Sequence, residues 1–193
     1  MNKLLASFAF FVTSLPTFAS LDLGAVTSRT PYDAYIRPVT DVLTQMRGDG
    51  PQMDRVMDLM REGRSFRYSH RNPLVAAAPE VTAAEREGDC KDKSLWLCNE
   101  LQDASVRYVI GKLNRNSRIN HAWVMWKHED RWWILDCTMT TRPIAADTLS
   151  DDQYVPFYSY SKSFAYRHTM ARNLASNTAS NRGASIASRA DRR

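Results

Sequence analysis

Apolar residues recur at intervals of three and four along several stretches of the chain, which is the spacing of one helix face. This spacing predicts helices over residues 32–46 and about 53–60, and a further helix from about 90 to 103. One face of this last helix carries Ser94, Leu97, Cys98 and Leu101. Gly48, Gly50 and Pro51 separate the first two helices.

Other stretches alternate or are rich in β-branched and aromatic residues, which is typical of strands. They predict strands over residues 106–113, 121–127 and 131–136, and an aromatic strand or cleft wall within 154–166. Because neighbouring strands can pair as hairpins while the helices lie elsewhere in the chain, the pattern predicts an α+β domain.

The strands over 121–127 and 131–136 predict a β-hairpin. If its turn centres on His128-Glu129, His121 lies directly opposite Asp136 and on the same face. Both faces of the hairpin are apolar, so we expect it inside a sheet rather than at its edge. A shift of one residue would place Asp136 on the opposite face from His121.

The two ends of the chain differ in composition from its centre. Residues 1–19 have a lysine, an apolar run from Leu4 to Leu15 and a small-x-small site at Thr17-Phe18-Ala19, which together predict a signal peptide. A retained N-terminal anchor is the alternative. Residues 20–170 form the predicted domain, with a loose start over 20–30. No later segment is apolar enough to span a bilayer.

The formal net charge of +5 is concentrated near the C-terminus. Residues 161–193 hold seven Lys or Arg and one Asp, and residues 171–193 are mostly Ala, Ser, Asn and Arg, which predicts a disordered basic tail. The tail could bind anionic lipid or polysaccharide, or be a solvated extension. Without it the domain is slightly acidic, so a nucleic-acid partner is not expected.

Export to the periplasm or medium of a bacterium makes the odd number of cysteines informative. Cys90, Cys98 and Cys137 fit one reactive thiol and one disulfide between the other two, or three free thiols with two buried.

Cys90, His121 and Asp136 carry the chemistry that this pattern favours. Cys90 follows Gly88-Asp89 at the start of a predicted helix, where the helix dipole and a nearby imidazolium favour the thiolate. Free N–H groups of the first turn could bind an oxyanion. His121 and Asp136 would supply the base and the acid that orients it. Each residue alone has ordinary structural explanations, and only the combination indicates a site.

The blocks around these residues resemble the signature blocks of the transglutaminase-like superfamily. They are Gly88-Asp89-Cys90-Lys91-Asp92, His121-Ala122-Trp123-Val124 and Trp132-Trp133-Ile134-Leu135-Asp136-Cys137-Thr138. The chain is most similar to the bacterial transglutaminase-like cysteine proteinases, over about residues 66–140. The resemblance implies a papain-like fold, in which a helix bearing Cys90 packs on an antiparallel sheet bearing His121 and Asp136.

The resemblance also bears on metals and on the oxyanion site. Some periplasmic members bind calcium through acidic residues flanking the Cys, and Asp89 and Asp92 match that pattern. Lys91, however, stands where these members often have an acid. Otherwise no cofactor is expected. Tyr68 is a candidate oxyanion donor by position only. His70, His128 and His168 lack metal-ligand spacing and are expected at the surface.

These observations predict an exported thiol hydrolase that cleaves peptide or protein amide bonds through a thioester, acting as a monomer. With an amine in place of water, the same site would be a protein-glutamine acyltransferase. Two more hypotheses stay open: a non-catalytic binding domain on the same fold, and a cell-wall amidase.

Overall fold

The computed structural model describes residues 21–72 and 74–170. The predicted signal peptide (1–19) and basic tail (171–193) lie outside the described residues. Within the described part, no helix is long and apolar enough to cross a membrane.

Four α-helices carry most of the apolar side chains that cover the sheet. Their bounds are Arg37–Gln45 (α1), Met53–Ser65 (α2), Pro79–Glu85 (α3) and Cys90–Leu101 (α4), and a short 3₁₀ helix (η1) covers Ala146–Thr148. α1 begins later than the predicted start at residue 32, because Tyr32–Tyr35 form a turn and Pro38 stands in the first helical turn. α2 runs further than predicted, and α4 follows the prediction to within two residues.

An antiparallel sheet, with strands of two to eight residues, forms the other layer of the described part of the chain. Its strand order is β1-β9-β8-β4-β5-β6-β7. The bounds are Ala25–Thr27 (β1), Arg107–Asn114 (β4), His121–His128 (β5), Arg131–Leu135 (β6), Ile144–Ala145 (β7), Gln153–Tyr160 (β8) and Ala165–Arg167 (β9). A separate parallel pair joins Arg67–Tyr68 (β2) to Glu87–Gly88 (β3).

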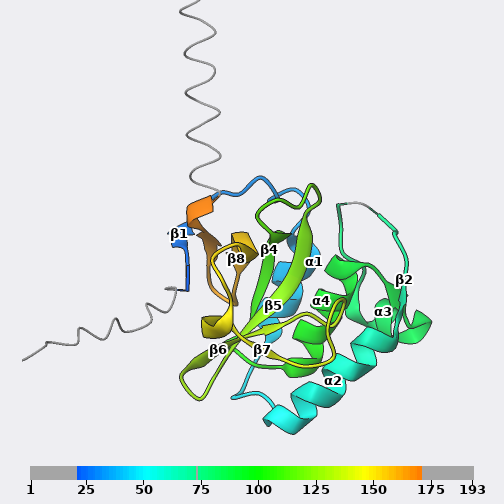
Figure 1. The fold of residues 1–193 in the computed structure, drawn as a ribbon. Helices are drawn as coiled ribbons and strands as arrows, with labels where there is room; N and C mark the ends of the chain where they lie inside the picture. The colour runs from blue at the N-terminus through cyan, green and yellow to red at the C-terminus, as the bar shows by residue number, and fades with distance from the viewer. Residues whose placement is uncertain (1–20, 73, 171–193) are drawn as a thin grey trace, which may run out of the picture.

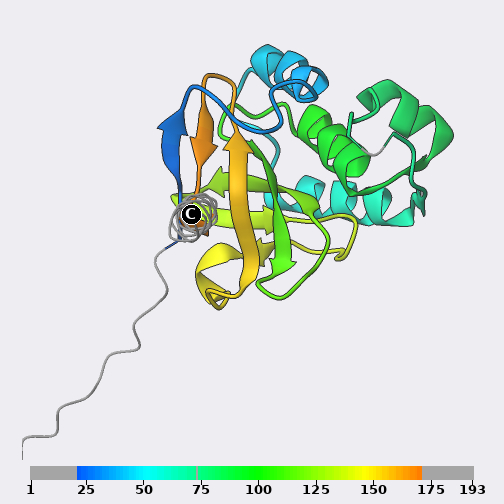
Figure 2. The same ribbon diagram turned by 90° about the horizontal axis from the view of Figure 1, so that it is seen from above.

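The helices lie on one face of this sheet, with α4 against β4 and β5 and between the other helices (Figures 1 and 2). Along β5, Ala122, Val124 and Trp126 belong to the core beneath the helices, whereas Trp123 and Met125 belong to a smaller cluster on the opposite face. β5 is therefore apolar on both faces, as an interior strand should be.

The β5–β6 hairpin confirms the predicted element but not its predicted register. Val124 pairs with Leu135 and Met125 with Ile134, so the turn centres on Glu129-Asp130 instead of His128-Glu129. Both turn residues have positive φ (48° and 59°), as a two-residue type I′ turn requires. The observed pairing is shifted by two positions along β6 relative to the predicted pairing. Because a shift of two keeps each side chain on its face, His121 and Asp136 still share a face, but they are diagonal rather than direct neighbours.

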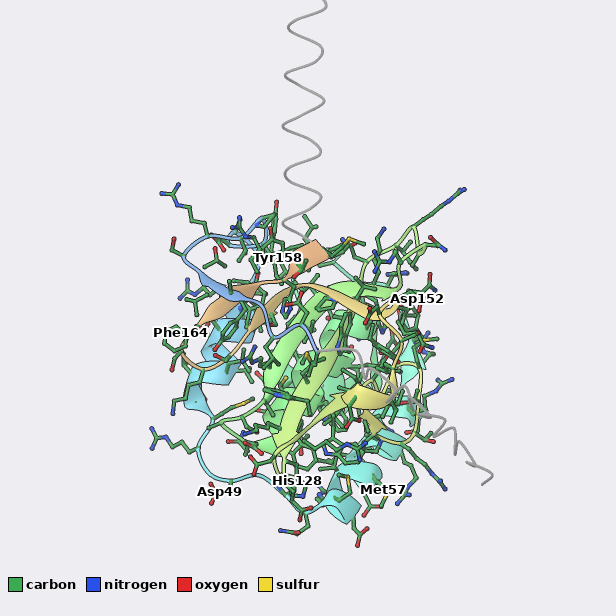
Figure 3. All side chains as sticks on the ribbon, turned by 60° about the vertical axis from the view of Figure 1, so that its left-hand side comes forward. Asp49, Met57, His128, Asp152, Tyr158 and Phe164 are labelled. Carbon is green, nitrogen blue, oxygen red and sulfur yellow. The ribbon has the colours of Figure 1, made fainter. Side chains whose placement is uncertain are left out.

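Near the sheet edge, two expectations are corrected and one is confirmed. Residues 25–27 of the predicted loose start form β1, because they pair with β9. The aromatic segment 154–166 does supply strand, as expected: it spans parts of β8 and β9, joined by a turn from which the exposed Phe164 projects (Figure 3). His168 is fully buried rather than at the surface.

Candidate active site

The N-terminus of α4 is closed by a capping box that fixes Cys90 as its first residue. Asp89 Oδ1 accepts a hydrogen bond from the Lys91 N–H (3.0 Å), and Asp92 Oδ2 accepts one from the Asp89 N–H (3.2 Å). A Cβ on Gly88 would lie 2.7 Å from the Asp92 Cβ, so only glycine fits beside this cap. The cap leaves the Cys90 thiol half-buried at the helix tip.

His121 and Asp136 form a close, buried pair. His121 Nε2 lies 2.8 Å from Asp136 Oδ2, and the two residues are 8% and 1% exposed. The other carboxylate oxygen, Oδ1, accepts the N–H groups of Thr138 (3.1 Å) and Met139 (3.2 Å). These donors hold the carboxylate in one orientation toward the ring.

The thiol of Cys90 joins this pair. The Cys90 side chain lies close enough to His121 to act on the charge of the ring, and because Nε2 faces Asp136, Nδ1 is the ring nitrogen left for sulfur. The Ser94 hydroxyl donates to the Ala122 carbonyl (3.0 Å), which ties α4 to the start of β5 beside His121. The structure thus brings together the three side chains that the sequence singled out.

The environment of His121 favours its charged form. Burial alone would lower its pKa, but the hydrogen bonds to Asp136 and Cys90 and the negative charge of both groups raise the pKa to about 9. The site therefore holds a positively charged ring beside the Cys90 side chain, where a base and acid for nucleophilic chemistry would be needed.

Tyr68 lies against Cys90, as its upstream position allowed. The parallel β2–β3 pair sets Tyr68 beside Gly88. Its hydroxyl interacts with the Cys90 side chain and backbone N–H, and burial together with the charges of Cys90 and Asp89 raises the pKa of Tyr68 to about 12. A hydroxyl with this pKa stays protonated at neutral pH and can donate a hydrogen bond.

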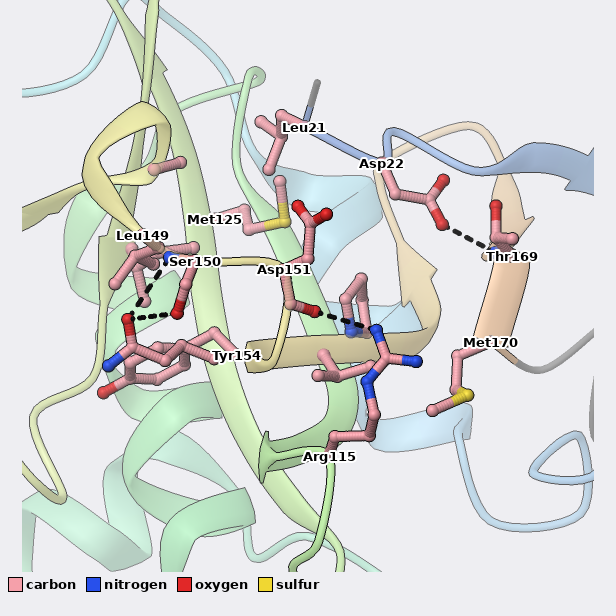
Figure 4. A pocket seen from close by; sticks show the side chains of 15 residues that line it. Leu21, Asp22, Arg115, Met125, Leu149, Ser150, Asp151, Tyr154, Thr169 and Met170 are labelled. Atoms are coloured by element: carbon pink, nitrogen blue, oxygen red, sulfur yellow. Dashed lines mark hydrogen bonds between the residues drawn. The ribbon is translucent and has the colours of Figure 1, made fainter. Parts of the chain in front are cut away.

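The sequence did not reveal that Tyr154 also reaches the site. Its hydroxyl donates to Asp136 Oδ2 (3.0 Å), the oxygen that faces His121. Tyr154 also lines a cavity of about 290 Å³ on the sheet face opposite the helices, together with Met125 and other side chains (Figure 4). No local pattern could have shown this contact, because residues 136 and 154 meet only through the folding of η1 and β8.

The acidic residues flanking Cys90 are occupied by partners from the chain itself. The Lys91 ammonium contacts Asp89 Oδ2 and lies 3.6 Å from Asp92 Oδ1. Asp92 Oδ1 also accepts the Ala77 N–H (2.8 Å). In the described part of the chain, no group of three or more His, Cys, Asp or Glu is arranged to hold a metal ion.

In the described part of the chain, the side chains of the remaining cysteines and histidines make no hydrogen bond or ion pair with the Cys90, His121 and Asp136 side chains, although His70 Nδ1 lies 3.6 Å from Asp89 Oδ2. All three cysteines are free thiols, so the Cys98–Cys137 disulfide is not formed, and the expectation of two buried thiols describes the structure. Burial raises the pKa of Cys98 well above its ordinary value and that of Cys137 to about 12. His70 is exposed, and His128 lies at the tip of the β5–β6 hairpin (Figure 3).

The fold and the three candidate side chains together describe the architecture of the site. A helix that begins at a cysteine packs on an antiparallel sheet that bears a His–Asp pair, and the thiol contacts the imidazole. This is the α+β arrangement that the sequence blocks led us to expect, with a Cys-bearing helix packed on an antiparallel sheet.

No protein-family model and no curated protein matches the chain. Among solved structures, the chain is similar to calcium-bound Legionella pneumophila LapG, with a TM-score of 0.49 and 14% identity over 69% of this chain and 87% of LapG. EGTA-treated LapG gives a TM-score of 0.47 and 12% identity over 71% and 87%. A candidate cysteine protease from Cytophaga hutchinsonii gives 0.38 and 16% over 72% and 60%.

Proposed function

We propose that this protein is a thiol hydrolase that cleaves amide bonds of peptides or proteins. The observation that carries the proposal is the position of His121, whose ring contacts the Cys90 thiol and the Asp136 carboxylate at the same time. In this proposal Cys90 is the nucleophile, His121 the general base and acid, and Asp136 the carboxylate that orients the ring.

The reaction follows from these positions. The Cys90 thiolate adds to the amide carbonyl carbon, and the carbonyl π electrons move to oxygen. His121 gives its proton to the nitrogen as the C–N bond breaks, which releases an amine and leaves a thioester. His121 then takes a proton from water, whose oxygen displaces sulfur to give a carboxylic acid. We assign the Tyr68 hydroxyl and the Cys90 N–H, which lie beside the thiol, as donors for the oxyanion.

Calcium does not fit the acidic residues beside Cys90 as they stand. Calcium takes six to eight oxygen ligands, whereas Asp89 and Asp92 already bind the Lys91 ammonium and backbone N–H groups. The proposed reaction therefore uses no metal, and Lys91 supplies the positive charge between the two carboxylates.

Export belongs to the same proposal. The chemistry of residues 1–19 is that of a signal peptide, and we place the mature enzyme in the periplasm or medium of a bacterium. Its substrates would be proteins or peptides met there.

The proposal is tested by trapping the thioester. The purified protein is incubated with denatured protein and peptide substrates, with hydroxylamine present, and the products are read by mass spectrometry. We expect cleaved peptides with new carboxyl termini, partly converted to hydroxamates, in the wild type and in Cys98→Ala but not in Cys90→Ala. Cleavage that persists in Cys90→Ala would overturn the assignment, and amine incorporation without cleavage would favour the acyltransferase.

A further inference from the structure

The Asp136 carboxylate receives four hydrogen-bond donors, and one of them comes from a distant strand. Oδ1 accepts two backbone N–H groups, while Oδ2 is shared by His121 Nε2 at 2.8 Å and the Tyr154 hydroxyl at 3.0 Å. Burial, followed by the charge of Asp136 and this hydrogen bond, raises the pKa of Tyr154 far above its ordinary value. Tyr154 therefore stays protonated and acts as a donor.

The backbone of Tyr154 is held in a conformation that tyrosine rarely adopts. Its φ is +45° within β8, in the left-handed region that favours glycine. Such strain in a bulky residue persists only where surrounding contacts require it, and it is concentrated at functional sites. Here the strained backbone directs the ring of a β8 residue toward the carboxylate.

An aromatic stack completes the connection between Tyr154 and the imidazole. The Tyr154 ring meets Trp123 edge-on, with centroids 5.4 Å apart at 75°, and Trp123 lies nearly parallel to the His121 ring at 6.2 Å. Tyr154 thus reaches His121 by two routes: through the shared oxygen of Asp136 and through the face of Trp123.

From this geometry we propose that Tyr154 is a positioning residue that sets the orientation and basicity of His121 through Asp136. This inference rests on the proposed function. By donating to the same oxygen, the hydroxyl neutralises part of the carboxylate charge that would otherwise stabilise the imidazolium. Tyr154 also lines the cavity on the opposite face of the sheet.

The test is the substitution Tyr154→Phe, which keeps the ring and removes the hydroxyl. Its matched control is Tyr158→Phe, a change on the same strand at a ring that packs on Tyr32 instead. With a cleavable peptide, we expect kcat to fall about tenfold, the effect of one hydrogen bond to a charged group, with KM unchanged. We also expect the alkaline limb of the profile of kcat against pH to move to higher pH, because the carboxylate would then stabilise the imidazolium more strongly. A purely structural role of Tyr154 would not produce this shift.

The outcomes separate this proposal from the proposed function. If Cys90→Ala keeps full turnover, the function itself fails, whatever Tyr154→Phe does. If Cys90→Ala is inactive while Tyr154→Phe matches Tyr158→Phe in kcat and in its alkaline limb, the role of Tyr154 is overturned. Should Tyr154→Phe not fold, 3-fluorotyrosine at position 154 keeps the shape and strengthens the donor. The limb should then move to lower pH, and an unmoved limb contradicts the proposal.

Discussion

At the scale of single residues, His121 connects the chemistry of the site to the stability of the fold. Its pKa in the folded protein is about 9, against an ordinary value of 6.5, because its contacts with Asp136 and Cys90 outweigh its burial. A group whose pKa rises on folding stabilises the folded state fully below its unfolded pKa, and this contribution disappears as the pH rises through its folded pKa. For His121, this stabilising contribution is therefore lost between about pH 6.5 and about pH 9.

The free energy of unfolding of the wild type and of His121→Gln, measured in urea between pH 6 and pH 10, tests this pH dependence. Below pH 6.5 the wild type should be the more stable by up to about 3 kcal/mol, the free-energy equivalent of the pKa difference. The advantage should shrink steadily up to about pH 9, because the imidazole then loses its proton in both states. An advantage that stays constant over this range would contradict the assigned environment of His121.

At the scale of elements, the first turn of α4 combines a capping box with an internal ion pair. Asp89, Asp92 and Lys91 are bound to one another, and Gly88 leaves room for them. The two carboxylates are 3% and 0% exposed, so the ammonium compensates charge where water cannot. The Lys91 ammonium therefore supplies a positive charge between the two carboxylates at the helix tip that carries Cys90.

Replacement of the ammonium by a carboxylate should change this behaviour. We expect the melting temperature of the wild type to be the same in millimolar calcium and in EGTA. Lys91→Glu should be destabilised in EGTA by repulsion among three acids, and calcium should raise its melting temperature by about 2–4 °C or more, equivalent to roughly 1 kcal/mol. The control is Lys127→Glu, which changes an exposed lysine at the hairpin. A wild type that calcium stabilises would disprove the internal-cation account.

The elements also show what the sequence could and could not predict. Helix periodicity located α4, and strand composition located β5 and β6, because both signals are local. Cys90 and His121 are the first residues of α4 and β5, and Asp136 directly follows β6, so the candidate site could be predicted with the fold. The hairpin register was wrong by two positions, because it depends on which two residues take positive φ in the turn.

Contacts between distant segments had no such signal. Tyr154 reaches Asp136 through a strained backbone within β8, and His168 is buried because β1 covers the sheet edge. The left-handed conformation of Tyr154 produces no recognisable periodicity of apolar residues in the sequence, and neither do the three-residue strands β1 and β9. These features are decided by long-range pairing, which single-sequence patterns do not record.

At the scale of the whole molecule, a buried histidine joins the two ends of the described chain. His168 Nδ1 donates to the Asp22 carbonyl (2.8 Å), and its Nε2 accepts from the Ser159 hydroxyl (2.9 Å). Burial is the main reason that the pKa of His168 is lowered, so the ring is neutral at pH 7. The Asp22 carboxylate also accepts the Thr169 N–H (2.6 Å). These bonds hold β1 and β9 at the sheet edge.

Loss of this ring should weaken the edge of the sheet. We expect His168→Ala to lower the free energy of unfolding by about 2–4 kcal/mol, because it leaves buried polar groups without partners and creates a cavity. His70→Ala, at an exposed histidine, should change it by less than about 0.5 kcal/mol. Urea denaturation of both variants at pH 7 makes the comparison, and equal stabilities would show that the His168 contacts contribute nothing.

The central claim is that Cys90 is a nucleophile activated by His121, and labelling followed by intact-mass analysis tests it most directly. The wild type, Cys90→Ala, His121→Ala and Cys98→Ala are treated with a peptidyl fluoromethyl ketone at pH 7. We predict one adduct per molecule in the wild type and Cys98→Ala, none in Cys90→Ala, and strongly slowed labelling in His121→Ala. Equal labelling of wild type and His121→Ala, or an adduct that survives Cys90→Ala, would contradict the claim.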